Sequence, residues 1–173
     1  MIDHSGVSIP EQAADGVWAR WIPAARAGGL FALMIVLAAC DGDGPTDPRV
    51  TALDAAQARW EAVGPRSYSY ALQRFCFCAP DYLGPARLRI EEGVVVEQVY
   101  VDSGLPVPPN LDFPTVDGLF EILRSAYEQD AHEVRVTYDP SLGVPVDFWI
   151  DYLEMAVDEE LGVEVTEPVE PIP

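Results

Sequence analysis

Apolar residues recur at helical spacing in two segments of this chain of 173 residues. The first predicted helix covers 51–63, with a capping-box-like start at Thr51 and a stop at Gly64-Pro65. The second covers 116–129 and follows Thr115. Each has one apolar face, so each is expected to lie on another layer of structure. The apolar positions are Leu53, Ala56, Trp60 and Val63 in the first helix, and Val116, Leu119, Phe120, Leu123, Ala126 and Tyr127 in the second.

Segments with the period-two alternation and β-branched or aromatic composition of strands follow each predicted helix. Short turns at 91–93 and 139–143 separate neighbouring segments. The pattern predicts the α+β class, in which two helix-plus-three-strand units form an antiparallel sheet with both helices packed on one face. The predicted strands lie at 67–78, 86–90 and 94–101 after the first helix, and at 133–138, 145–152 and 162–165 after the second.

The segment 27–39 is apolar, follows Arg20 and Arg26, and ends at Cys40. Basic residues, an apolar stretch of about 7–15 residues and small residues at its end make an export signal, whereas a membrane-spanning helix needs about 20 apolar residues. We therefore predict a lipoprotein signal peptide at 1–39. A lipidated cysteine and flexible tether at 40–49, a single domain at 50–167 and a proline-rich extended tail at 168–173 follow it.

The four residues Leu37-Ala38-Ala39-Cys40 resemble the bacterial lipobox, in which a diacylglyceryl group joins the cysteine sulfur and the preceding peptide bond is cut. The resemblance implies cleavage after Ala39 and fatty chains, such as palmitate, on Cys40. Two or more chains anchor a protein durably. The expected location is the bacterial cell envelope, on the inner or the outer membrane, with the domain outside the cytoplasm.

Several short motifs follow one another in a fixed order: Trp60, Tyr68-Ser69-Tyr70, Cys76-Phe77-Cys78, the helix start from Thr115 to Phe120, and the turn from Tyr138-Asp139-Pro140 to Gly143-Val144-Pro145. Together they resemble an uncharacterised bacterial family, catalogued as domain of unknown function 6174. The resemblance covers about residues 50–167. It implies exported, often lipid-anchored proteins with a paired cysteine, and it implies no activity.

Acidic residues dominate the charge: 29 Asp and Glu stand against ten basic residues, all of them arginine, for a net charge of −19. Such a surface repels phosphate backbones, so nucleic acid is excluded as a partner. Solubility is the simplest role for this charge. No glycine-rich phosphate loop is present, which argues against a nucleotide, and no cofactor is expected.

Cys76 and Cys78 remain once Cys40 carries lipid, and a structural disulfide between them is the favoured interpretation outside the cytoplasm. In a regular strand their Cα atoms would lie about 6.5–7 Å apart, so a bond needs a departure from the strand, for which Ala79-Pro80 provides a place. Redox-active thiols and metal ligation stay open as alternatives. Either would make the chain a thiol–disulfide or metal-handling envelope protein.

His132 is the one histidine beyond the signal segment, so a weak hydrolase would have to recruit it with neighbouring carboxylates. No nucleophile-elbow motif accompanies it, and a solvated loop position is the simpler interpretation. The carboxylates of Asp147, Asp151 and 158–160 are expected to be solvated, with cation binding left open.

We therefore expect a non-enzymatic binding or structural module that is attached to a membrane by lipid and offers an exposed surface to another envelope protein or to an envelope ligand. Trp149 alternates onto the polar face of its predicted strand, between Asp147 and Asp151. An aromatic side chain among acids on an outward face is a candidate contact residue, and Phe75 and Phe77 are further candidates. The simpler alternative is that the C-terminal tail covers Trp149, which then has no binding role.

Overall fold

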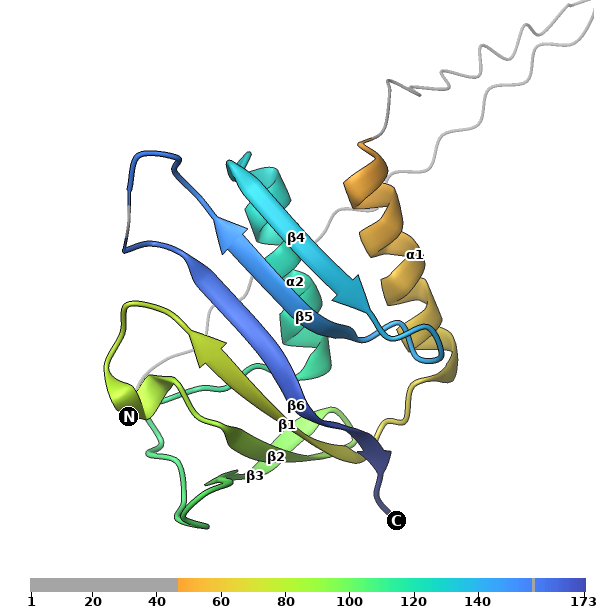
Figure 1. Cartoon of the computed structure of the whole chain (residues 1–173). Coiled ribbons are helices and arrows are strands. Elements are labelled where there is room, and N and C mark those ends of the chain that lie inside the picture. The colour runs from red at the N-terminus through yellow and green to blue at the C-terminus, as the bar shows by residue number, and fades with distance from the viewer. Residues whose placement is uncertain (1–46, 157) are drawn as a thin grey trace, which may run out of the picture. The chain divides into compact units, whose positions relative to one another are not determined.

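The computed structural model describes residues 47–156 and 158–173, which form two α-helices and a six-stranded antiparallel sheet (Figure 1). The α+β class predicted from the sequence is confirmed. The predicted signal peptide, the lipobox at Leu37-Ala38-Ala39-Cys40 and most of the tether lie outside the described residues. The elements are α1 (Pro48–Val63), β1 (Tyr68–Phe75), the 3-10 turn η1 (Pro80–Tyr82), β2 (Ala86–Glu91), β3 (Val94–Tyr100), α2 (Val116–Glu128), β4 (Glu133–Tyr138), β5 (Pro145–Asp151) and β6 (Leu161–Pro171).

The strand order across the sheet is β3-β2-β1-β6-β5-β4. Short turns join β2 to β3 and β4 to β5, while longer loops join β1 to β2 and β5 to β6. Strands β1 and β6 meet at the centre, where Tyr68 lies opposite Pro171 and Phe75 opposite Gly162. An isolated bridge pairs Val99 of the edge strand β3 with Pro106 in the loop that follows. The last strand of the domain is thus central, and it holds the two halves of the sheet together.

Both helices pack on the same face of the sheet, since their buried residues and those of one sheet face make up one core cluster. Figure 1 shows α2 behind β4 and β5, and α1 beside it. Among the described residues, no helix is both long enough and apolar enough to cross a membrane. The largest fully buried side chains include Tyr70, Phe120, Phe148, Leu53, Leu72, Leu88, Ile90, Leu119, Leu123 and Ile150.

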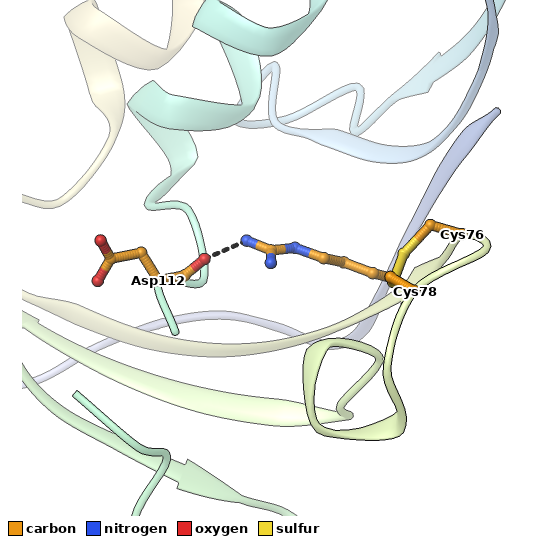
Figure 2. Close-up of a disulfide and its surroundings, with 4 residues drawn as sticks. Cys76, Cys78 and Asp112 are labelled. Atoms are coloured by element: carbon orange, nitrogen blue, oxygen red, sulfur yellow. Dashed lines mark hydrogen bonds between the residues drawn. A yellow bond between two sulfur atoms is a disulfide. The ribbon is translucent and has the colours of Figure 1, made fainter. Parts of the chain in front are cut away.

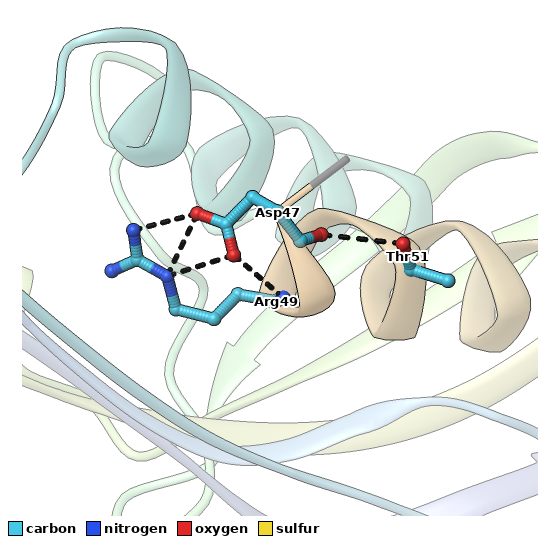
Figure 3. Close-up of polar contacts among 3 residues, drawn as sticks. All are labelled: Asp47, Arg49 and Thr51. Carbon is cyan, nitrogen blue, oxygen red and sulfur yellow. Dashed lines mark hydrogen bonds and ion pairs between the residues drawn. The ribbon is translucent and has the colours of Figure 1, made fainter. Parts of the chain in front are cut away.

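Helix α1 begins at Pro48, before the start at Thr51 predicted from the sequence. Asp47 caps the helix, because its carboxylate accepts a hydrogen bond of 2.8 Å from the Arg49 backbone N–H (Figure 3). The Arg49 guanidinium folds back onto the same carboxylate, with Nη2 2.7 Å from Oδ2. Proline suits the first helical position, since its missing N–H would have no helical partner there. Part of the predicted tether is therefore the first turn of a helix.

The buried face of α1 is shorter than its sequence pattern suggests. Leu53, Ala56 and Trp60 are buried, but the predicted fourth residue, Val63, is 58% exposed because the helix ends there. Trp60 packs edge-on against Tyr68, with ring centroids 5.3 Å apart, and its indole Nε1–H donates to Asp117 over 2.9 Å. Trp60 thus joins α1 to β1 and to the start of α2.

Two buried tyrosines of β1 bind the segment that leads into α2. The Tyr68 hydroxyl accepts a hydrogen bond of 3.2 Å from the Val116 N–H, and the Tyr70 hydroxyl donates to the Pro114 carbonyl oxygen. Burial raises the pKa of Tyr68 to about 12 and raises the pKa of Tyr70 as well. Both hydroxyls therefore stay protonated at neutral pH and position the start of α2 over the sheet.

Strand β6 extends further than the sequence predicted, because residues expected to form a tail at 168–173 pair with β1 as far as Pro171. Proline lacks an N–H for a sheet ladder and is tolerated at bulges or on an open strand side. Strand β5 pairs only with Leu161–Glu164, so one side of β6 is open beyond that point. On the other side, Ala71 of β1 pairs with Glu167 and Ser69 with Glu170, and the register shifts between these two pairs, where Pro168 lies. These irregularities accommodate the prolines within a strand.

The turn between β4 and β5 packs tightly against α1. Gly143 adopts φ +81°, and a Cβ built on it would lie 2.2 Å from the Ala56 carbonyl oxygen. Gly93, in the β2–β3 turn, has the same φ, but nothing lies within 4 Å of its Cβ position. A side chain at either glycine would strain the backbone, but only a side chain at Gly143 would also clash with a neighbouring element.

We expect Gly143→Ala to lower the free energy of unfolding by about 2–4 kcal/mol, because it combines a strained φ with a clash against α1. Gly93→Ala should cost only about 1 kcal/mol, since the strain acts alone. Urea denaturation followed by circular dichroism would measure both changes. Equal losses in the two variants would contradict the close approach of the turn to α1.

Candidate interaction surface

The face of the sheet opposite the helices has no element packed on it in the described part of the chain, and a row of side chains crosses it. Strand register places Arg135 opposite Trp149, Trp149 opposite Gly162, and Gly162 opposite Phe75. Residues directly opposite on neighbouring antiparallel strands share a face. The row Arg135-Trp149-Gly162-Phe75, called the aromatic row below, therefore runs from the edge strand β4 to β1.

Gly162 is the reason that the two aromatic residues lie together. A Cβ at Gly162 would lie 2.8 Å from Trp149 Cε3 and 3.1 Å from Phe75 Cβ, so only glycine leaves room for the indole over the strand. Trp149 is half-buried as a result, and Phe75 is 40% exposed. An isolated glycine within a strand pattern is a known sign of such close approach, and sequence reasoning did not use it here.

Carboxylates lie next to the aromatic row. Asp147 of β5 is opposite Glu164 of β6, and Asp151 of β5 is opposite Glu133 of β4. Glu133 contacts Arg135, with 3.4 Å between Oε1 and Nε. Trp149 is thus flanked along its own strand by acids, as its position between Asp147 and Asp151 predicted, and the surface suits a partner that offers apolar and basic groups.

Further along the same face, Arg87 of β2 and Glu167 of β6 form a bidentate pair, with 2.6 Å from Nε to Oε2 and 2.5 Å from Nη2 to Oε1. Both lie opposite Ala71 of β1, which is completely buried on this face. The hydrogen bonds from Arg87 lower the pKa of Glu167. This ion pair covers the central strand. Exposed apolar side chains on this face therefore lie at the aromatic row and, at the far edge, at Val94 of β3, which is opposite Glu91 and 63% exposed.

The structure brings Cys76 and Cys78 together just after β1 ends, as Figure 2 shows. The sulfur atoms are 1.95 Å apart and the Cα atoms 5.3 Å apart, within disulfide range. The departure from strand geometry expected near Ala79-Pro80 occurs at Cys76, and the structure supports the favoured disulfide. Phe77, between the two cysteines, is 85% exposed.

The described residues form no assembled site for hydrolysis by His132 or for metal binding. His132 is exposed at the start of β4, and its imidazole makes no hydrogen bond within the described part of the chain. Glu159, expected to be solvated, instead accepts hydrogen bonds from the backbone N–H groups of Tyr152 and Leu153, at 2.9 and 2.8 Å, and closes the β5–β6 loop. No group of three or more potential ligands within 47–156 and 158–173 is placed to hold a metal ion.

A cavity of about 430 Å³ lies where three motifs of the family resemblance meet, at Trp60, Tyr68 and Asp117. Glu61 and Glu92 also line it, and the exposed Arg66 lies 3.8 Å from Glu92. Arg66 is itself part of the lining, so three carboxylates stand against one guanidinium, which disfavours an anion. We assign this cavity no role beyond the packing of α1 against β1 and α2.

If the disulfide is structural, the unfolded chain should contain no alkylatable thiol at Cys76 or Cys78 without reductant, and two after reduction, as measured by mass spectrometry after iodoacetamide treatment. Reduction should lower the free energy of unfolding by no more than about 2 kcal/mol, because the bond closes a very short loop. Two free thiols in the untreated protein would contradict a structural disulfide and favour the redox interpretation.

Comparison with known proteins identifies a family and no function. A family model described as "Family of unknown function (DUF6174)" matches residues 52–169. No curated protein matches the chain, and no solved structure matches it. The match spans nearly every described element, from the first turns of α1 to the last residues of β6. The chain therefore belongs to the DUF6174 family, whose function is unknown.

Proposed function

We propose that this protein is a lipid-anchored component of the bacterial envelope with a non-enzymatic binding or structural role. The observation that carries the proposal is the tetrad Leu37-Ala38-Ala39-Cys40 behind an apolar segment and directly ahead of a folded domain. Cleavage before Cys40 would leave only a short tether between the lipid and the cap of α1 at Asp47. Such an anchor holds a domain close to a membrane surface.

Two properties of the domain support this location. The sulfur atoms of Cys76 and Cys78 lie at bonding distance, and disulfides persist in oxidising compartments outside the cytoplasm. The chain has a net charge of −19, and residues 40–173 keep −18 of it, with 26 acids against eight arginines. Such a charge keeps a domain soluble beside an anionic membrane without adhering to it.

The open sheet face is the proposed contact surface for a second envelope protein. Aromatic side chains are enriched at the centres of interfaces, where carboxylates at the rim select basic partners. Trp149 and Phe75 lie side by side over Gly162, and Phe77 projects from the adjacent disulfide loop. These three residues form the apolar centre of the proposed contact.

Thiol–disulfide exchange is a second candidate function, favoured by the exposure of the disulfide loop. Cys78 and Phe77 are exposed, so a dithiol partner would have access to the bond. Metal handling by the same cysteines would require their reduced form.

We also interpret the domain as two units, each a helix followed by three strands. The order of elements and the placement of β3-β2-β1 beside β6-β5-β4 support this interpretation. It would place the proposed contact surface across the junction between the units.

Cys40→Ser should abolish lipidation and release the protein from the membrane fraction, because serine offers no thiol for the lipid. Metabolic labelling with a radioactive or alkyne-tagged palmitate, together with fractionation, would measure both effects. Cys76→Ser serves as the matched control and should keep the label. A wild-type chain that is uncut and unlabelled at Cys40 would refute the proposed location.

A photo-crosslinking residue placed at Trp149 should yield a discrete adduct in the native envelope, whereas the same residue at Ala58, exposed on α1, should not. The sheet face and the helix layer lie on opposite sides of the domain, so the pair tests which side meets a partner. Gel shift and mass spectrometry would identify the adduct. Adducts at Ala58 alone would assign the contact to the helices.

A further inference from the structure

A second open cavity, of about 510 Å³, lies on the helix side of the sheet beside the end of β1. Its volume is in the range of small-molecule sites. Arg74 lines it from β1, Leu161 from β6 and Tyr152 from the residue after β5, while α2 and the loop before it supply the remaining wall. That wall consists of Asp112, Pro114, Gly118, Glu121, Ile122 and Ser125.

Arg74 is the unusual residue of this cavity. Of the eight arginines in the described residues, six have a carboxylate oxygen within 4.0 Å; Arg74 and Arg59 have none among those residues. Arg59 is exposed and donates to the Pro140 carbonyl oxygen, whereas Arg74 is half-buried. In a chain with 29 acids against ten basic residues, an arginine on the core side of a sheet without an anionic partner is unexpected.

The surroundings of Arg74 hold its guanidinium in place without a direct ion pair, although the charge of Asp112 favours the protonated form. The guanidinium lies over the Phe113 ring, 4.6 Å from Cζ to the ring centroid, and Nη2 donates to the Asp112 backbone carbonyl oxygen. Figure 2 shows that this oxygen faces the guanidinium while the Asp112 carboxylate points away. Burial lowers the pKa of Arg74, although the group stays charged at neutral pH. Its Nε and Nη1 donors make no hydrogen bond to the described residues.

The other residues that line the cavity indicate which kind of ligand could accept hydrogen bonds from the free donors of Arg74. A guanidinium fork binds a carboxylate through two parallel hydrogen bonds. Leu161, Ile122 and Pro114 offer apolar contact, and the Tyr152 ring lies beside them. The first turn of α2, at Gly118, adds the partial positive charge of a helix N-terminus, whereas Glu121 opposes a ligand with several negative charges.

We propose that the Arg74 cavity binds a small carboxylic acid with an apolar body. The carboxylate would pair with the free edge of the Arg74 guanidinium, and the apolar body would lie against Leu161 and Ile122. This site is separate from the aromatic row, which lies on the opposite face of the sheet. It does not depend on the lipid anchor.

Isothermal titration of the full-length protein with cyclohexanecarboxylate tests the proposal. We expect saturable binding at one site, and a loss of about tenfold or more in affinity for Arg74→Gln, because a charge-assisted pair is removed. Arg59→Gln is the matched control, since it removes the other arginine without a carboxylate neighbour, and it should bind as the wild type does. Cyclohexanemethanol and inorganic phosphate, which each lack one half of the proposed ligand, should bind more weakly.

Ser125→Phe provides a second variant in case Arg74→Gln disturbs packing against Phe113. It fills the cavity from the surface of α2, leaves Arg74 in place, and should abolish binding. The proposal is overturned if the wild type shows no saturable binding, if the folded Arg74→Gln or Ser125→Phe protein binds as tightly as the wild type, or if the alcohol or phosphate binds as tightly as the carboxylate.

Discussion

The antiparallel pairing of β1 with β6 is the interaction on which the rest of the domain depends. It joins the first strand to the last along the centre of the sheet, from Tyr68 opposite Pro171 to Phe75 opposite Gly162. Without it, β3-β2-β1 and β6-β5-β4 would be separate three-stranded ribbons, each with an open edge. Because the register of this pair fixes which residues share a row, it also sets the composition of both proposed surfaces.

The end of β1 supplies both surfaces, because successive residues of a strand point to opposite faces. Arg74 lies on the helix side, opposite the buried Val163, and reaches the cavity beside α2. Phe75 lies on the open side, in the aromatic row. Cys76 follows immediately, where the chain leaves the strand and bonds to Cys78.

The two sides of the sheet differ in how their polar groups are satisfied. On the helix side, Tyr68 and Tyr70 bind backbone groups around the start of α2, and Trp60 binds Asp117, so buried polar atoms position the helices. On the open side, Arg87 and Glu167 pair across Ala71, and the exposed Asp147 and the half-buried Asp151 flank Trp149. Charged side chains thus surround a small apolar centre on the open face. On the helix side, the charged Asp117 and Arg74 instead bind the Trp60 N–H and a backbone carbonyl oxygen.

The sequence alone determined the class of the fold, because periodicity is a local property: α2 follows its 3.6-residue pattern, and β4 and β5 follow their alternation. It also predicted that Trp149 faces away from the core and that Cys76 and Cys78 form a bond. Only the tertiary structure decided that β6 runs to Pro171, that Asp47 caps α1, and that Gly162 makes room for Trp149 beside Phe75. These features depend on pairing and contact between distant segments. Arg74 follows Tyr68, Tyr70 and Leu72 as the next alternate residue of β1, so the sequence alone places it on the inner face. That no carboxylate pairs with it depends on where the acidic side chains lie in the folded domain.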